Sequence, residues 1–317
     1  MKQDLRTKFA DPSRGVYLIG TCPPKDGTSP EQATEIATKL LARLGQIDFD
    51  GLIVYDIQDE SSRTDVPRLF PFMRTLDPRM YSKLVRELAD HPVITYKSVS
   101  QRDRADFSNW LDDAWQNYGV RDMVMVGSPS TDGDIKLSLN DAYETTAEHP
   151  LNYQIGGVTI AERHAKKGDE HLRLLDKSAK GCEFFVSQAV YNAQATVDML
   201  TSYARECRLR GEQPKRIILT FTPCGSAKTL EFMEWLGISV PEGTRWRILD
   251  SANPLMESIR ICRNNLEQIL DAVIDLGLPL GLNIESLTNR KDEIDASIRL
   301  YKLLKATLDL RLAEQQL

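Results

Sequence analysis

Short apolar runs alternate along the chain with longer segments whose apolar residues recur at helical spacing. The runs are too short for helices and end in polar or glycine-containing loops, as buried parallel strands do. This pattern predicts eight strands. They cover residues 15–22, 51–55, 92–98, 123–126, 154–160, 184–186, 216–221 and 279–284.

Helix start signals lie between these runs. Ser29 precedes a proline and is followed three residues later by Gln32, which is the order of a helix N-cap with a capping box. Asn192 is the predicted N-cap of a second long helix. Helices are predicted over residues 29–44, 78–88, 104–118, 169–179, 192–209, 256–276 and 291–308, with one ending near residue 236 and a weakly marked one over 139–146.

Eight strands that alternate with helices, without a strong internal linker, favour a single (β/α)8 TIM barrel over an open doubly wound sheet. The glycine-rich G-x-G-x-x-G fingerprint of dinucleotide-binding open sheets is missing after the first strand. Seven strands is the alternative, because the fourth strand is short. We expect a polar lead-in at residues 1–14, a barrel domain over 15–317, and an extra helical insertion before the eighth strand.

Composition narrows the class of protein. The 317 residues carry a net charge of −6 without a basic block, so we expect no nucleic-acid partner. No apolar run is long enough to span a membrane, and the charged N-terminus does not resemble a signal peptide. The five cysteines form no C-x-x-C pair, which fits reduced thiols in a cytoplasmic protein.

In a (β/α)8 barrel, functional side chains follow the C-terminal ends of the strands. Here these positions are rich in carboxylates and amides and hold one histidine, so neither a metal site nor a Ser-His-Asp triad is expected. In chain order, the candidate residues are Thr21, Asp59, Glu60, Tyr96, Ser128, Glu162, His164, Gln188, Thr222 and Glu285.

Three carboxylates, Asp56, Asp59 and Glu60, follow the second strand. A carboxyl group that is partly buried beside another carboxylate has a raised pKa and can donate a proton near neutrality. Glu60 and Asp59 are therefore candidate acids. The alternative is a solvated loop in which they pair with Arg63 or Arg68.

Gln188 follows the sixth strand and offers both a donor and an acceptor to a heterocycle with an amide-like edge, so we favour a ligand role for it. His164 has two readings, a ligand contact or proton carrier and a structural hydrogen bond. For Glu285, a salt bridge with Arg290 or Lys291 is the favoured alternative to a ligand contact.

Six of these positions lie in five motifs that resemble those of the methylenetetrahydrofolate reductase superfamily. The family's Phe-Glu-Phe-Phe-Pro-Pro, Arg-Gly-Asp, Pro-Glu-x-His-Pro, Gln-aromatic and Gly-Ile-x-Pro motifs follow strands one, four, five, six and seven. Their counterparts here are Ile19-Gly20-Thr21-Cys22-Pro23-Pro24, Val126-Gly127-Ser128, Ala161-Glu162-Arg163-His164-Ala165, Ser187-Gln188-Ala189-Val190-Tyr191 and Thr220-Phe221-Thr222-Pro223. The resemblance covers residues 15–302.

The departures from the family pattern are specific. The family's catalytic acid falls on Gly20, and its aspartate facing flavin and pterin falls on Ser128, whereas Gln188, Glu162 and His164 keep their residue types. The chain is thus similar to the divergent branch that works without bound flavin.

The resemblance implies reduction of 5,10-methylenetetrahydrofolate to 5-methyltetrahydrofolate by direct hydride transfer from NADH or NADPH. It implies a folate site with Gln188, Ser128, Tyr96, Thr222 and Glu285, a cofactor site with Glu162, His164 and Thr21, and Glu60 or Asp59 as substitute acid. Three alternatives stay open. They are an FAD-dependent reductase, a non-catalytic folate-binding homologue, and a barrel with another one-carbon or pterin reaction, such as methyl transfer.

Overall fold

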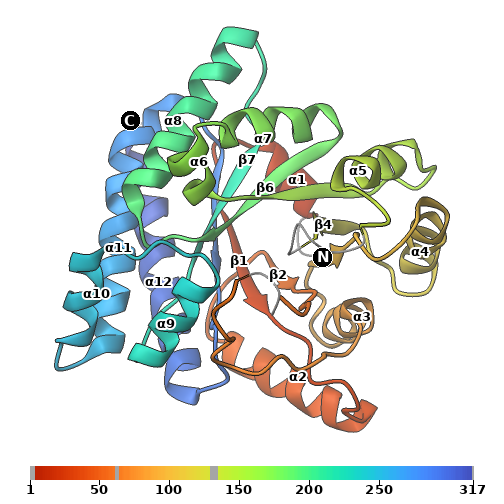
Figure 1. Ribbon diagram of the computed structural model, residues 1–317, viewed down its shortest axis with the longest axis horizontal. Helices are drawn as coiled ribbons and strands as arrows, with labels where there is room; N and C mark the ends of the chain where they lie inside the picture. Colours follow the sequence, from red (N-terminus) through yellow and green to blue (C-terminus); the bar gives the residue numbers. More distant parts are fainter. Residues whose placement is uncertain (1–3, 61–63, 129–134, 316–317) are drawn as a thin grey trace. The chain divides into compact units, whose positions relative to one another are not determined.

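The computed structural model describes residues 4–60, 64–128 and 135–315. Eight parallel strands follow one another in the closed order β1 to β8, and at least one helix joins each strand to the next (Figure 1). The predicted (β/α)8 barrel is therefore confirmed, and the alternative of seven strands is wrong.

The predicted strands all form, with bounds that shift by a few residues. They are β1 (Val16–Thr21), β2 (Gly51–Val54), β3 (Val93–Ser98), β4 (Asp122–Val126), β5 (Gln154–Thr159), β6 (Cys182–Ala189), β7 (Arg216–Phe221) and β8 (Leu280–Ile284).

The helices between and after the strands are mostly those that the periodicity predicts. They are α1 (Leu5–Ala10), α2 (Pro30–Leu44), α3 (Pro78–Ala89), α4 (Arg104–Gln116), α5 (Leu139–Glu148), α6 (Ala161–Lys167), α7 (Glu170–Ala179), α8 (Ala193–Arg210), α9 (Ala227–Trp235), α10 (Glu242–Leu249), α11 (Pro254–Val273), the 3-10 turn η1 (Ile274–Leu276) and α12 (Lys291–Glu314).

The chain divides into two compact units. The first unit contains residues up to Arg6, Ile19–Val158 and Lys177–Glu183, and the second contains Thr7–Leu18, Thr159–Asp176 and the chain from Phe184 onwards. Each unit has its own run of parallel strands in register, which brings the C-terminal ends of those strands to one edge. In the first unit the run is β2 to β5, and in the second it is β6 to β8.

The strands form the core because their side chains are apolar on both faces. Leu52, Ile53 and Val54 of β2 are fully buried, as expected for a parallel strand covered by helices. The capping box of α2 also forms, since Ser29 and Gln32 exchange two bonds of 3.3 Å between side chain and backbone. Local signals therefore set both the strands and the first turn of this helix.

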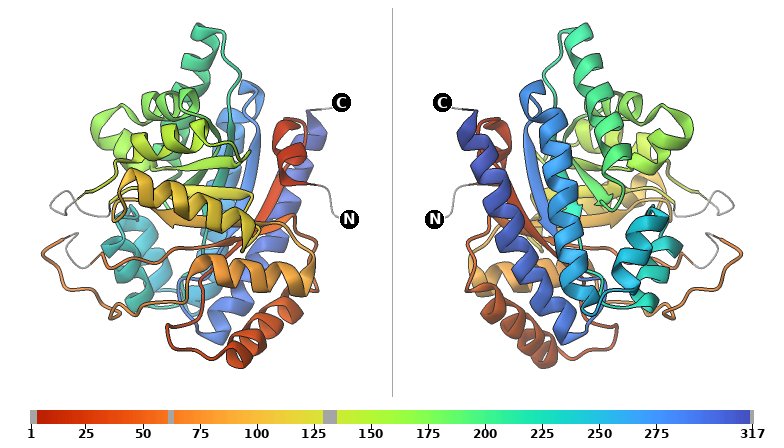
Figure 2. Two further views of the ribbon diagram at one scale, coloured as in Figure 1. Left: turned by 90° about the vertical axis from the view of Figure 1, so that its right-hand side faces the viewer. Right: turned by 90° about the vertical axis from the view of Figure 1, so that its left-hand side faces the viewer.

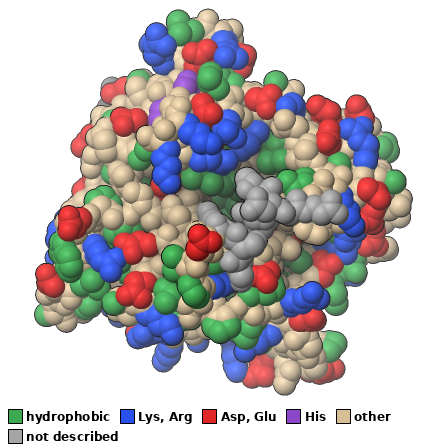
Figure 3. All heavy atoms as spheres, in the orientation of Figure 1, with side chains coloured by type: hydrophobic (Ala, Val, Ile, Leu, Met, Phe, Trp, Pro, Cys, Tyr) green, Lys and Arg blue, Asp and Glu red, His purple; other side chains and the backbone are tan. Residues whose placement is uncertain are grey.

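Helices of the second unit pack against one another. Figure 2 shows α11 and α12 running side by side, and α11 also contacts α8. None of the helices in the described part of the chain combines the length and the apolar character needed to cross a membrane. Acidic and basic side chains are both spread over the face drawn in Figure 3.

Arg216, the first residue of β7, is almost completely buried in the second unit. Its guanidinium donates hydrogen bonds to five backbone carbonyls, which belong to Lys8, Phe9, Asp11, Arg14 and Leu280. The ring of Phe9 also packs against that of Phe184, with centroids 4.6 Å apart. Much of the segment expected to be a polar lead-in is thus tied into the fold by these contacts.

Two local predictions are wrong. Residues 161–168, for which the sequence predicts no helix, form helix α6, which ends at Gly168 in the left-handed conformation with φ 70°. None of the residues of α6 is buried, so there is no apolar period to reveal it. Strand β6 is longer than the predicted 184–186, because polar Glu183 and Ser187 interrupt the apolar run within it.

Candidate functional site

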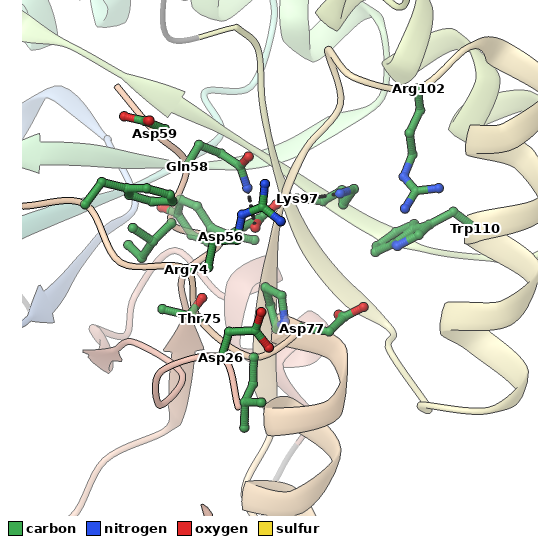
Figure 4. A pocket seen from close by; sticks show the side chains of 15 residues that line it. Asp26, Asp56, Gln58, Asp59, Arg74, Thr75, Asp77, Lys97, Arg102 and Trp110 are labelled. Atoms are coloured by element: carbon green, nitrogen blue, oxygen red, sulfur yellow. Dashed lines mark hydrogen bonds and ion pairs between the residues drawn. The ribbon is translucent and has the colours of Figure 1, made fainter. Parts of the chain in front are cut away.

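A cavity of about 420 Å³ lies in the first unit, beyond the C-terminal ends of β2 and β3 (Figure 4). Its wall combines acids, bases and aromatic rings from five segments of that unit. The lining residues are Asp26, Asp56, Ile57, Gln58, Asp59, Phe72, Arg74, Thr75, Leu76, Asp77, Pro78, Tyr96, Lys97, Arg102 and Trp110.

Asp56 holds the inner part of this cavity together. Its carboxylate accepts hydrogen bonds from the backbone N–H of Ser98 at 2.8 Å and from the side-chain amide of Gln58 at 2.7 Å. The ammonium of Lys97 lies 3.6 Å away, and the two charged side chains are only 8 % and 15 % exposed. Because the nitrogen of Gln58 is directed at Asp56, its amide oxygen is the end left to accept a hydrogen bond from a ligand.

Lys97 is a cation in a partly desolvated place. Burial lowers the pKa of its ammonium, and the charge of Asp56 acts in the opposite direction. The Nζ atom also lies 5.3 Å from the centre of the Trp110 ring, which is within the range of a cation–π contact. A ligand anion placed here would therefore meet a positive charge that water screens weakly.

Two arginines face the same cavity. Figure 4 shows the guanidinium of Arg74 directed toward its centre, and Arg102 reaching toward Trp110. Arg102 is bound to Asp106 through two contacts of 3.0 and 2.8 Å. Arg74 makes no side-chain hydrogen bond or ion pair with the residues that the structure describes.

Asp77, the N-cap of α3, is bound by Arg79, which also bonds to Asp113 at 2.7 Å. Burial acts to raise the pKa of Asp77, but the hydrogen bonds and the charge of Arg79 outweigh burial and hold the pKa below its usual value. Arg79 in turn lies over the ring of Trp110 at 5.0 Å. The carboxylate of Asp77 in this wall of the cavity is therefore already paired.

Of the site residues predicted in the first unit, some line the cavity and others do not. Asp59 and Tyr96 line it, whereas Glu60 follows Asp59 and is not among the lining residues. Thr21 ends β1 and accepts a backbone bond from Tyr55 at 3.0 Å through its carbonyl. Ser128 follows β4 by two residues. Arg63, considered as a partner of the acids, falls outside the described residues.

Gln188 lies in an irregular part of β6. The register between β6 and β7 shifts between Val186 and Ala189, and the hydroxyl of Ser187 accepts the bond from Thr220 N–H at 2.9 Å. Such a bulge turns a side chain away from the regular alternation. The amide nitrogen of Gln188 donates to the carbonyl of Leu236 at 2.7 Å, and its buried oxygen has no hydrogen-bond partner among the described residues.

Two further side chains of the second unit hold the same segment, which we call the α9–α10 loop (residues 236–241). The carboxylate of Glu162 accepts a bond from Ser239 N–H at 3.1 Å, and Asn192 lies 3.4 Å from the Ser239 hydroxyl. Burial raises the pKa of Glu162, while its hydrogen bond to Ser239 acts to lower it. Glu162 and Gln188, both candidates for binding, therefore contact the chain's own backbone.

The other candidates of the second unit lie in the packing between elements. His164 contacts Ser202 of α8 at 3.4 Å, and its ring meets that of His171 in α7 with centroids 5.2 Å apart. Thr222 is fully buried, and its carbonyl accepts from the Tyr191 hydroxyl at 2.8 Å. The backbone N–H of Glu285 bonds to Phe221 at 3.1 Å. The ligand roles of these residues stay predictions.

The cations that line the cavity, and the ring of Trp110, were not among the site residues predicted from the sequence. Lys97 carried a signal, because a lysine inside a predicted buried strand must find an anionic partner. Arg74 and Trp110 carried none, since they come from a loop and a helix that the fold alone brings to the ends of β2 and β3.

NADH, NADPH and FAD each carry a pyrophosphate, and a site that binds one must neutralise its negative charge. The cavity is lined by three cations, Lys97, Arg74 and Arg102, but by four aspartates, Asp26, Asp56, Asp59 and Asp77. This balance opposes a pyrophosphate, whose negative charges lie on two adjacent phosphates and need more than one cation at the same point. The residues of the cavity do not fit such a cofactor, and we derive no step through one.

The fold and this cavity define a (β/α)8-barrel protein with a small-molecule site of mixed charge. The chain is similar to an uncharacterized protein from Clostridium thermocellum that binds two copies of 5-methyl-5,6,7,8-tetrahydrofolic acid, with 35 % identity and a TM-score of 0.81. The match covers 96 % of this chain and 99 % of that one. This chain belongs to the same family as that protein.

Two other solved structures match with much lower similarity. One is 2,3-dimethylmalate lyase, a member of the PEP mutase/isocitrate lyase superfamily, with 11 % identity and a TM-score of 0.48 over 98 % of this chain and 82 % of that one. The other is oxaloacetate acetylhydrolase in complex with the product oxalate, with 12 % identity and a TM-score of 0.47 over 99 % of this chain and 86 % of that one. We draw no argument from them. No protein-family model and no curated protein matches the chain. The resemblance to the methylenetetrahydrofolate reductase superfamily stays a prediction.

Proposed function

We propose that this protein binds a reduced folate of the 5-methyltetrahydrofolate class. The observation that carries the proposal is the relative from Clostridium thermocellum, which binds that compound and matches this chain over 96 % of its length. Folate binding was among the functions expected from the sequence, with and without catalysis.

The cavity of the first unit supports the proposal by its chemistry. Its volume of about 420 Å³ is within the range of small-molecule sites. A reduced folate has a pterin with N–H donors, an aromatic linker and a glutamate tail with carboxylates. The cavity offers acceptors at Asp59 and at the Gln58 amide oxygen, rings at Tyr96 and Trp110, and cations for the tail.

The relative binds two copies of its ligand, so a second site belongs to the proposal. We place it at the end of β6 in the second unit. The buried amide oxygen of Gln188, without a partner among the described residues, supports this place because a pterin N–H can satisfy it.

Reduction of 5,10-methylenetetrahydrofolate with NADH or NADPH is the second candidate function. What supports it is the order of the motifs that resemble the reductase superfamily, with Glu60 or Asp59 as the proton donor. Asp59 has the better position of the two, because it lines the cavity.

A titration of the purified protein with 5-methyltetrahydrofolate, followed by calorimetry, tests the binding proposal. We expect saturable binding with two folates per chain. Absence of binding at millimolar folate overturns the proposal.

The second candidate is tested on the same preparation by oxidation of NADH and NADPH with and without 5,10-methylenetetrahydrofolate. Folate-dependent oxidation by a colourless protein supports direct hydride transfer, and a flavin spectrum supports the FAD-dependent alternative. Folate binding without oxidation of either nicotinamide leaves a binding protein and removes the reductase.

A further inference from the structure

Three cations of the first unit converge on one side of the cavity, and we call them the cationic edge: Arg74, Lys97 and Arg102 (Figure 4). They come from the loop before α3, from β3 and from the turn before α4. No motif of the sequence points to this edge, and the folate binding proposed above does not say which of its cations binds the tail.

The charges around the edge are not equally available to a ligand. Lys97 is paired with Asp56 at 3.6 Å, and Arg102 is paired with Asp106 at 2.8 Å. Arg74 has no such side-chain partner in the part of the chain that the structure describes. Arg74 is therefore the cation whose charge a ligand can take up without breaking an ion pair.

The backbone of Arg74 is fixed although its side chain is exposed. Its carbonyl accepts a bond from Asp26 N–H at 2.9 Å, and the next residue, Thr75, forms an antiparallel bridge with Lys25. Leu76 N–H completes the pairing with Pro24 at 2.8 Å. A guanidinium that projects from a pinned segment loses less conformational freedom on binding than one on a loose loop.

We propose that the cationic edge binds the carboxylates of the folate's glutamate tail, with Arg74 as the principal contact; this rests on the folate binding proposed above. A guanidinium binds a carboxylate through two parallel hydrogen bonds. A carboxylate also fits the balance of charge better than a pyrophosphate does, because it needs only the one cation that is unpaired.

The glutamate end of the folate is therefore the part that contacts the cationic edge. The first carboxylate takes up the charge of Arg74. The additional carboxylates of a longer tail lie several bonds apart and are attracted by Lys97 and Arg102 in addition to the existing ion pairs of these residues, so affinity increases with the number of glutamates. A tetrahydropterin that lacks the aminobenzoylglutamate part makes no contact with the edge.

The test uses the full chain and three probes: 5-methyltetrahydrofolate, its triglutamate form and 6-methyltetrahydropterin. Arg74→Gln should weaken 5-methyltetrahydrofolate about tenfold, as expected for loss of a hydrogen bond to a charged group. It should also abolish the advantage of the triglutamate and leave the affinity for the pterin unchanged.

Arg104→Gln is the matched control. Arg104 is an exposed arginine of α4 that lies outside the cavity lining and faces Glu144 and Glu148 at 3.8 Å, so its loss should leave all three affinities unchanged. Arg102→Gln is a second variant with a several-fold loss expected in the same two probes. Equal thermal stability of the variants shows that they fold.

Folate binding that Arg74→Gln and Arg102→Gln leave unchanged, without a preference for the triglutamate, overturns the cationic edge but not the folate site. A wild-type protein that binds no folate overturns the proposed function itself.

Discussion

The strand ends of the two units carry similar polar side chains and use them differently. In the first unit, Asp56 and Lys97 stand beside a cavity, and their contacts leave a neighbouring amide oxygen and arginine for a ligand. In the second unit, Gln188 and Glu162 bind backbone groups of the α9–α10 loop. A polar residue at a strand end is thus no guarantee of a ligand contact, because a nearby loop can take up part of its hydrogen-bonding capacity, as it does for the amide nitrogen of Gln188.

The largest effect on this comparison is expected from Asp56→Ala. The substitution leaves Lys97 without its anion and Ser98 N–H without its acceptor, in a place where both partners are largely buried. We expect a loss of about 3 kcal/mol in the free energy of unfolding, measured by chemical denaturation.

Asp56→Asn is the control for this variant, because it keeps the shape and an acceptor but removes the charge. It should lose clearly less stability than Asp56→Ala. Equal losses would show that the charge of Lys97 matters more than the hydrogen bonds, and a loss below about 1 kcal/mol in both would contradict the assigned role.

A pH titration compares a carboxyl group with a raised pKa in each unit, Asp122 in the first and Glu162 in the second. Burial raises the pKa of Asp122, at the start of β4, from 3.8 to about 7, with help from Asp4 and Glu183 and against Arg6 and Arg86. The folded state therefore holds the proton more tightly than the unfolded state. Its stabilising effect is present at low pH and is lost as the pH rises toward 7.

Thermal or chemical unfolding at several pH values measures this effect. Between pH 5 and pH 8 we expect a loss on the order of 2 kcal/mol, and Asp122→Asn should remove it and stabilise the protein at pH 8. Glu162→Gln in the second unit should change the profile in the same direction. A profile that Asp122→Asn leaves unchanged would assign the pH dependence to other groups.

The smallest effect is expected from Gln188→Ala, which decides whether the comparison holds. If the α9–α10 loop is the main partner of Gln188, the variant should lose about 1 kcal/mol of stability, and amide hydrogens at residues 236–239 should exchange faster. Unchanged stability and exchange would contradict the role of the loop as its partner. Weaker folate binding would support the second site proposed at the amide oxygen of Gln188. Asn192→Ala should loosen the same loop and serves as the comparison variant.

Much of the fold followed from local signals. The apolar runs placed all eight strands, and the order of Ser29 and Gln32 placed the start of α2. Helix α6 was not predicted, because none of its residues is buried and the chain there has no apolar period. Its formation therefore depends on the neighbouring elements rather than on its own pattern.

The sequence by itself determined that polar residues stand at the ends of buried strands, because strand burial and turn chemistry are local properties. It placed Gln188 and Asp56 alike just after buried strands. Only the tertiary structure decided their partners: Gln188 bonds to a carbonyl 48 residues away, and Asp56 to an N–H 42 residues away. Such pairings depend on which loops the closed order of strands brings together, and no local pattern records that choice.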